Sequence, residues 1–230
     1  MADHGSLQSM VKYYGPLVSC GNYPYWQGHH HTMIDAVKAY IPAGGVSVHC
    51  GTSDGVLNIT SGKIDCALPE GRYNATSVAA AAAVAAAADA VILVVGTDLK
   101  FASEGHDAQN ISFPDAQARL IEQVAAASKK PVIVVTITAN ALDIAAILQN
   151  PKVGAVLHAG APAESSMGAA DLIFGHKVPA GRTIQTIYDN AWQDSISIRK
   201  WTRKTKQSKL FSALAAFHIL SSVSLAIDEH

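Results

Sequence analysis

The chain has 230 residues, 49% of them hydrophobic, and its 17 basic and 18 acidic residues nearly balance. These values exclude a disordered tail, a collagen-like rod and a nucleic-acid-binding arm, and a chain of this length can bury a full hydrophobic core. Six of the 17 bases lie between Arg199 and Lys209, so the rest of the chain is mildly acidic. We therefore expect no nucleic-acid partner.

The first third of the chain predicts two short strands and one helix. Residues 10–14 form an apolar run that ends at a Gly-Pro pair, which is typical of a strand. Thr32 can cap a helix that reaches Tyr40 and ends before Pro42. Residues 46–49 predict a second strand, whereas residues 51–71 have no sustained period and predict a long loop.

From Ser77 onward, helical segments and apolar runs alternate regularly. Ser77 can cap an alanine helix over residues 78–88, because alanine loses no rotamer freedom in a helix. The β-branched run 91–95 ends at Gly96 and predicts a strand buried on both faces of a parallel sheet. Pro114 fits the first turn of the next helix, whose buried stripe we expect to be Leu120, Ile121 and Val124. The remaining predicted elements are strand 132–137, helix 142–148, strand 153–157 and helix 167–174.

This alternation predicts an α/β fold, a three-layer α/β/α sandwich with a mostly parallel sheet. Ligands of such sheets bind beyond the carboxyl ends of the strands, here in the loops after Val95, Ile137 and Leu157. We assign residues 1–198 to this domain and residues 199–230 to a basic, then apolar, tail. Residues 210–227 are interrupted by serines and a histidine, whereas a membrane span needs about 20 apolar residues. The tail can therefore be a helix packed on a neighbouring surface, a membrane or interfacial helix, or disordered sequence.

Three sequons suggest an extracellular glycoprotein. Asn58, Asn74 and Asn110 each begin an N-x-S/T triplet without proline, although chance alone supplies one or two in a chain of this size. If the chain is secreted, Cys50 and Cys66 are the likelier disulfide pair, and Cys20 is left over. Residues 1–15 have no basic region followed by an apolar one, so we expect no cleavable signal at this start.

Common catalytic and cofactor motifs do not occur in the sequence. There is no dinucleotide fingerprint, P-loop, G-x-S-x-G elbow or H-E-x-x-H motif, and the run of histidines at 29–31 has no partner at metal-ligand spacing. We therefore expect neither a cofactor nor a metal. The loop after the buried strand holds two kinds of acid/base group. Asp98, Glu104, His106 and Asp107 are candidates for sugar binding or acid/base chemistry there, although loops are commonly polar without a function.

The order and spacing of six blocks resemble the C-terminal α/β sandwich domain of glycoside hydrolase family 3, in its β-xylosidase and β-glucosidase branch. The likeness spans about residues 10–198 and is looser before residue 66. The blocks are residues 91–107, 113–117, 130–135, 150–160, 171–175 and 179–182.

The resemblance implies a division of the catalytic residues between two domains. In that family a (β/α)8 barrel supplies an aspartate nucleophile, and the sandwich domain supplies the acid/base glutamate. A barrel takes about 250 residues, so we expect no nucleophile within these 230 residues. Retaining hydrolysis needs two carboxyl groups about 5–5.5 Å apart. This sequence therefore holds at most half of the pair.

The acid/base half also departs from the family pattern. Where relatives read E-A-E-G-x-D-R, residues 102–108 read A-S-E-G-H-D-A, so Ala102 occupies the donor position and Glu104 matches a second, structural glutamate. Glu104 is a weak candidate for a substitute donor, reached by a slip of the loop. The family's glycine-rich turn is replaced by residues 161–166, which lack glycine and so suggest a remodelled substrate edge.

Three functions remain open. We expect a non-catalytic glycosidase-like domain that contacts carbohydrate or associates with copies of itself. The alternatives are half of an enzyme that docks on a separately encoded barrel protein, and a ligand-binding protein without glycans. Self-association has a physical motive, because a domain that normally covers a barrel has an apolar face that needs a partner. The tail is a candidate cover, and its contact with a membrane is the less favoured possibility.

Overall fold

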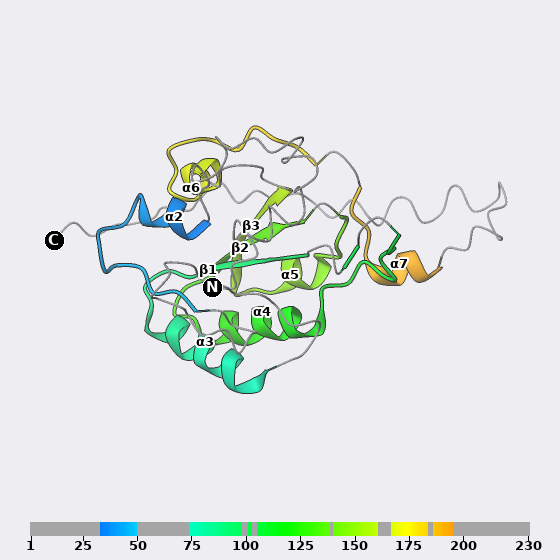
Figure 1. Ribbon diagram of the computed structural model, residues 1–230, viewed down its shortest axis with the longest axis horizontal. Helices are drawn as coiled ribbons and strands as arrows, with labels where there is room; N and C mark the ends of the chain where they lie inside the picture. The colour runs from blue at the N-terminus through cyan, green and yellow to red at the C-terminus, as the bar shows by residue number, and fades with distance from the viewer. Residues whose placement is uncertain are drawn as a thin grey trace.

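The computed structural model describes residues 33–49, 74–97, 101–102, 105–138, 140–160, 167–183 and 186–195. Within these ranges the centre of the molecule is a parallel sheet of three strands in the order β1-β2-β3 (Figure 1). The strands are β1 (Ile92–Gly96), β2 (Val132–Ile137) and β3 (Val153–Gly160). Val94 pairs with Val135, which in turn pairs with Leu157, so β-branched and leucine side chains run across the sheet.

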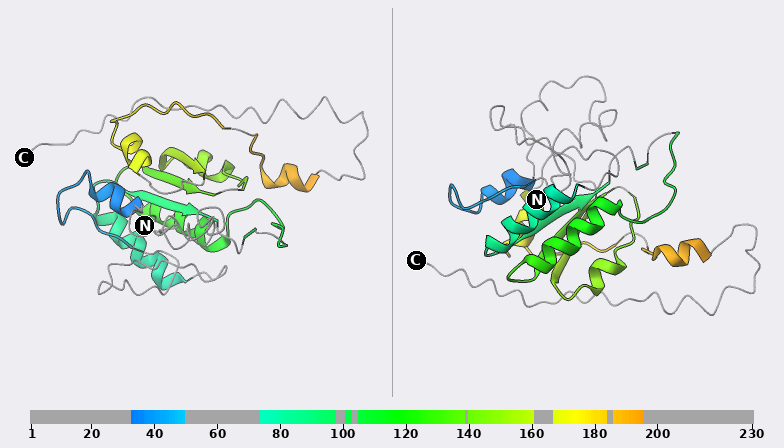
Figure 2. Two further views of the ribbon diagram at one scale, coloured as in Figure 1. Left: turned by 45° about the horizontal axis from the view of Figure 1, so that its top comes forward. Right: turned by 90° about the horizontal axis from the view of Figure 1, so that it is seen from below.

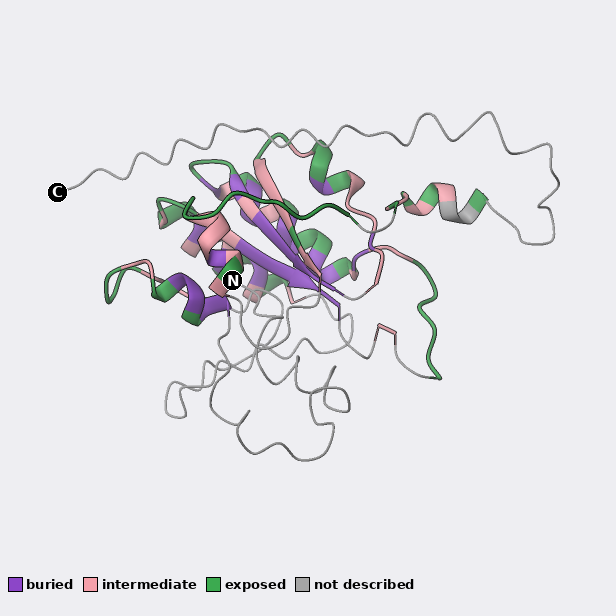
Figure 3. Cartoon of the chain, turned by 90° about the horizontal axis from the view of Figure 1, so that it is seen from above, coloured by how far each residue is buried: buried purple, intermediate pink, exposed green. Residues whose placement is uncertain are grey.

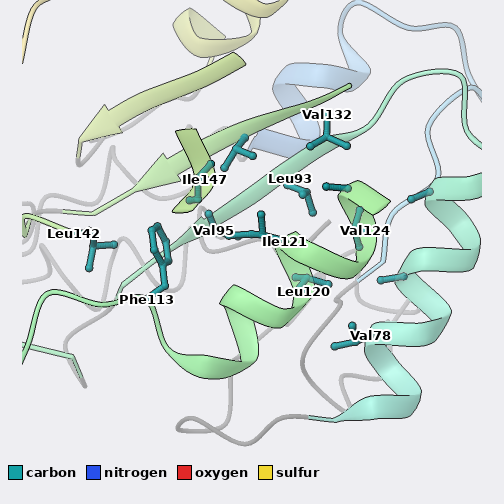
Figure 4. Close-up of a cluster of buried hydrophobic side chains, with 14 residues drawn as sticks. Val78, Leu93, Val95, Phe113, Leu120, Ile121, Val124, Val132, Leu142 and Ile147 are labelled. Atoms are coloured by element: carbon teal, nitrogen blue, oxygen red, sulfur yellow. The ribbon is translucent and has the colours of Figure 1, made fainter. Parts of the chain in front are cut away.

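One face of the sheet is covered by α3 (Ala75–Ala87) and α4 (Asp115–Ala127), which pack on each other (Figures 1 and 2). Val78 of α3 and Leu120, Ile121 and Val124 of α4 meet Leu93 of β1 in a buried cluster (Figure 4). The short helix α5 (Ala145–Gln149) contacts β3 and adds a buried isoleucine to the same cluster. This lower core holds most of the large buried side chains and supplies much of the hydrophobic stabilisation.

The opposite face is covered by α2 (Met33–Lys38) and α6 (Met167–Ile173), so the described residues form three layers (Figure 2). Met33 and Val37 of α2 are buried against Val135 of β2. Just beyond α2, the Tyr40 hydroxyl donates a hydrogen bond to Asp171 of α6, and this bond raises the pKa of Tyr40. The Tyr40 ring also stacks on Phe174, with centroids 4.8 Å apart, which joins the two helices.

The α/β sandwich and its parallel sheet are confirmed. The predicted strand 132–137 matches β2 residue for residue, the predicted stripe of α4 is buried, and β1 and α6 begin or end within one residue of their predicted bounds. The elements 10–14 and 51–71 and the tail 199–230 lie outside the described residues. The domain boundary at residue 198 stays a prediction.

Four expectations need correction. Residues 46–49 are not a strand, because no strand among the described residues pairs with them. Val46 instead packs on the cluster that contains Met33, Val37 and Val135. The cap of α3 is Asn74, whose side chain accepts a hydrogen bond from the Ser77 N–H at 3.1 Å. The helix predicted from 142 begins only at Ala145, and β3 runs three residues further than predicted. β3 is also only partly buried, unlike β1 and β2 (Figure 3).

Candidate functional site

The carboxyl ends of the three strands are joined to one another by hydrogen bonds between polar groups. The Thr97 N–H donates to the Ile137 carbonyl at 3.1 Å, and the Thr138 N–H donates to the Gly160 carbonyl at 2.8 Å. The hydroxyls of Thr97 and Thr138 lie 2.6 Å apart, and both residues are buried. The three strand ends are thus linked to one another just before their loops begin, so the loops start from fixed positions.

A buried glutamine holds the end of β1. Gln117 of α4 is 1% exposed, and its amide makes two hydrogen bonds to the backbone of one residue. The Gly96 N–H donates to Gln117 Oε1 at 2.9 Å, and Gln117 Nε2 donates to the Gly96 carbonyl at 2.7 Å. A Cβ atom at Gly96 would overlap the Ile137 carbonyl oxygen, so this close approach requires glycine. The Gln117 amide therefore makes the two backbone hydrogen bonds that a neighbouring strand would make, and these bonds fix the position at which the loop after β1 begins.

That loop contains the predicted site residues, of which the structure describes only some. Asp98 and Glu104 lie outside the described residues. Phe101 packs on the lower core, and Ala102 follows it in a partly buried position. His106 and Asp107 are exposed beyond Gly105, which has a φ of +76°. The described part of the loop thus shows a methyl group at position 102 and solvated polar groups beyond it.

The continuation of the loop is tied to a helix that the sequence did not predict, α7 (Asn190–Ser195). One oxygen of the Asp143 carboxylate accepts the Ala145 N–H at 2.8 Å, and the other accepts the Asn190 N–H at 2.9 Å. The Asn190 side-chain oxygen accepts the Ile111 N–H at 3.4 Å, and the Ile111 carbonyl accepts the Asp143 N–H at 2.7 Å. Three loops at the carboxyl edge therefore meet at Asp143 and Asn190, at the same end of the sheet as α7 (Figure 1).

An aromatic pair begins α7. The rings of Tyr188 and Trp192 stack with centroids 3.6 Å apart and planes 8° from parallel. Between them, Asp189 Oδ1 accepts the Trp192 N–H at 2.5 Å, which is an N-cap contact. Sequence reasoning missed both this pair and the Asp143 link. The signal available was the run Tyr188–Trp192, an aromatic residue, a cap residue and a second aromatic residue three positions after the cap.

The outer strand carries a histidine joined to its neighbour. Thr136 Oγ1 and His158 Nδ1 lie 3.0 Å apart across β2 and β3. The His158 side chain is largely exposed to solvent, but its imidazole ring is partly desolvated, and this desolvation lowers its pKa. Within the described ranges, no three His, Cys, Asp or Glu side chains gather closely enough to hold a metal ion.

Two of the three sequons can be placed. Asn110 is exposed, and its side-chain oxygen accepts the Ser112 N–H at 3.0 Å in a local turn. Asn74 is partly buried as the cap of α3, whereas Asn58, Cys50 and Cys66 lie outside the described residues. None of the helices in the described part of the chain has the length and apolar character of a bilayer span.

Comparisons with known proteins agree on one family. A family model described as the glycosyl hydrolase family 3 C-terminal domain matches residues 3–216. The chain is 36% identical over 110 residues to a beta-xylosidase/alpha-L-arabinofuranosidase of Medicago sativa, covering 47% of this chain and 14% of that protein. It is 32% identical over 180 residues to a probable exo-1,4-beta-xylosidase of Aspergillus japonicus, covering 77% of this chain and 20% of that protein.

A solved structure shows the same fold. The GH3 beta-glucosidase of Bifidobacterium adolescentis superposes with a TM-score of 0.56 at 27% identity, over 76% of this chain and 23% of that one. The chain thus spans less than a quarter of the length of each of these relatives.

Proposed function

Since the chain belongs to the family of the glycosyl hydrolase family 3 C-terminal domain, we propose that it is a non-catalytic member of that family. Its role on this proposal is to contact carbohydrate and to associate with copies of itself as an extracellular glycoprotein. The domain is similar in sequence to part of the β-xylosidases and in structure to part of a β-glucosidase. What distinguishes it is the chemistry of the loop after β1.

Ala102 is the observation that carries this proposal. The family resemblance assigns the proton donor to this position, and a methyl group has no proton to give to a leaving oxygen. The neighbouring Phe101 packs on the lower core, which anchors the chain one residue before Ala102. The exposed His106 and Asp107 are suited to hydrogen bonds with sugar hydroxyls.

The test is hydrolysis by the purified full chain. We expect that neither the wild-type chain nor Glu104→Gln releases nitrophenol from 4-nitrophenyl β-D-xyloside or β-D-glucoside faster than buffer does. Release by the wild-type chain that disappears in Glu104→Gln would mean that Glu104 takes part in catalysis and would refute the proposal.

Self-association has structural support on the side of β3. This strand is one of the two outer strands of the described sheet and is only partly buried, and Leu148 of the adjoining helix α5 is 54% exposed. A polar replacement there removes apolar area from the proposed contact. We expect Leu148→Glu, or deletion of residues 200–230, to shift the mass measured by light scattering toward the monomer. A wild-type chain that is already monomeric would refute self-association.

A second function, half of an enzyme completed by a separate barrel protein, is favoured by one observation. The relatives that this chain matches over 14–20% of their length are named as xylosidases, so the corresponding segment belongs to larger enzymes. Purification of the chain from its native source distinguishes the two. A bound polypeptide of barrel size would favour the enzyme half, and an assembly of this chain alone would favour the non-catalytic role.

A further inference from the structure

The aromatic pair at the start of α7 is unusual in being both fixed and accessible. Tyr188 and Trp192 stack on each other through one face of each ring, and both remain partly exposed. The Asp189 cap and the stack both lie at the start of the helix, and the stack uses only one face of each ring. We call these two residues the Tyr188–Trp192 platform.

The platform is held in place by polar bonds from the body of the domain. A helix of six residues is too short to be stable alone, so its position depends on external partners. Those partners are Asp143 and Ile111, which bind the backbone and the side chain of Asn190. Two views show α7 at the end of the sheet from which the loop with His106 and Asp107 extends (Figures 1 and 2). A surface fixed in this way loses little entropy when a ligand binds.

From this arrangement we propose that the Tyr188–Trp192 platform binds a xylosyl residue of a β-1,4-linked xylooligosaccharide. The axial C–H groups on one face of a pyranose ring match the electron-rich face of an indole. The exposed Asp189 carboxylate beside the ring uses Oδ1 for the cap, so Oδ2 can accept a hydrogen bond from a sugar hydroxyl. This proposal rests on the proposed carbohydrate contact and assigns it a location.

The surroundings favour a sugar over a docked protein. Protein interfaces bury about 800 Å² per partner around an apolar centre, far more than two rings provide. Among the described residues, the two strongly exposed large hydrophobic side chains are Leu148 and Val178, which belong to other segments of the chain. A small aromatic surface edged by a carboxylate is instead the scale of a single sugar ring.

The experiment is a titration of the full chain with xylotetraose, measured by isothermal titration calorimetry. We expect Trp192→Ala to weaken binding about tenfold, and Trp192→Phe, which keeps an aromatic face, to weaken it about threefold or less. Tyr40→Phe is the matched control, because Tyr40 is also a stacked, partly exposed aromatic residue but lies between α2 and α6. The Tyr40→Phe variant should bind xylotetraose as tightly as the wild-type chain does.

A second measurement does not depend on the folding of the alanine variant. The chain has three tryptophans, Trp26, Trp192 and Trp201. In wild-type chain labelled with 5-fluorotryptophan, the fluorine signal that is lost in Trp192→Phe is the signal of Trp192. We expect xylotetraose to shift the Trp192 signal. Binding by the wild-type chain that leaves this signal and the Trp192→Ala affinity unchanged overturns the platform alone. No binding by the wild-type chain overturns both the platform and the carbohydrate contact.

Discussion

Replacing Gln117 by methionine should destabilise the whole domain, although the residue lies on a helix and touches no ligand. Methionine has nearly the same length and volume, so it fills the site without leaving a large cavity. It removes both hydrogen bonds to the backbone of Gly96 and leaves that N–H and that carbonyl buried without a partner.

The structure sets the size of the effect. A buried polar group left without a partner costs about 1–3 kcal/mol. Two such groups at Gly96 therefore cost about 2–6 kcal/mol, against a total stability of about 5–15 kcal/mol for an ordinary domain. This loss of stability should be the same at any pH, since neither Gln117 nor the backbone of Gly96 is ionisable.

The assay is urea unfolding of the full chain, followed by circular dichroism at 25 °C. The matched control is Glu122→Met, which puts the same side chain on the exposed face of the same helix and should change the free energy of unfolding by less than about 0.5 kcal/mol. If Gln117→Met is as stable as the control, the two hydrogen bonds do not hold β1 and the reasoning fails.

Three further predictions concern other parts of the domain. Gly96→Ala should abolish cooperative thermal unfolding because its Cβ has no space, whereas Gly168→Ala in α6, where space is open, should raise stability by about 0.5–1 kcal/mol; equal effects would contradict this. Desolvation lowers the pKa of His158 below the ordinary histidine value of 6.5. The folded chain therefore has its full stability above pH 6.5 and loses stability as the pH falls and the histidine becomes protonated. The melting temperature should therefore drop more between pH 7 and 5 for the wild-type chain than for His158→Gln, and parallel curves would contradict this. Chain from a eukaryotic secretory host should lose glycan mass in Asn110→Gln, and an unchanged intact mass would contradict modification at that exposed sequon.

Much of the fold follows from local patterns. β1 and β2 are runs rich in β-branched residues, and α4 repeats apolar residues at helical spacing, so their identity depends little on the rest of the chain. Residues 46–49 have a similar β-rich composition, but no strand in the described part of the chain pairs with them, and a strand needs a neighbour for its backbone groups. Local sequence does not reveal whether that neighbour is present.

The architecture of the edge was harder to predict, because it depends on contacts between distant residues. Gln117 carried a signal, since it is three positions before Leu120 and four before Ile121, on the buried stripe of α4. A polar residue on that stripe must find a buried partner, but nothing local identifies Gly96, 21 positions earlier. The link from Asp143 to Asn190 spans 47 positions and has no periodic pattern.

The central claim is that position 102 leaves this domain without a proton donor. The most direct test is the activity of the chain in the assembly in which it occurs naturally, purified through an affinity tag, with wild-type and Glu104→Gln chains compared on β-1,4-xylobiose, whose sugar leaving group needs a proton. The account predicts that the Glu104→Gln assembly releases xylose no more slowly than the wild-type assembly. A wild-type assembly that releases xylose at a rate lost in Glu104→Gln would contradict it.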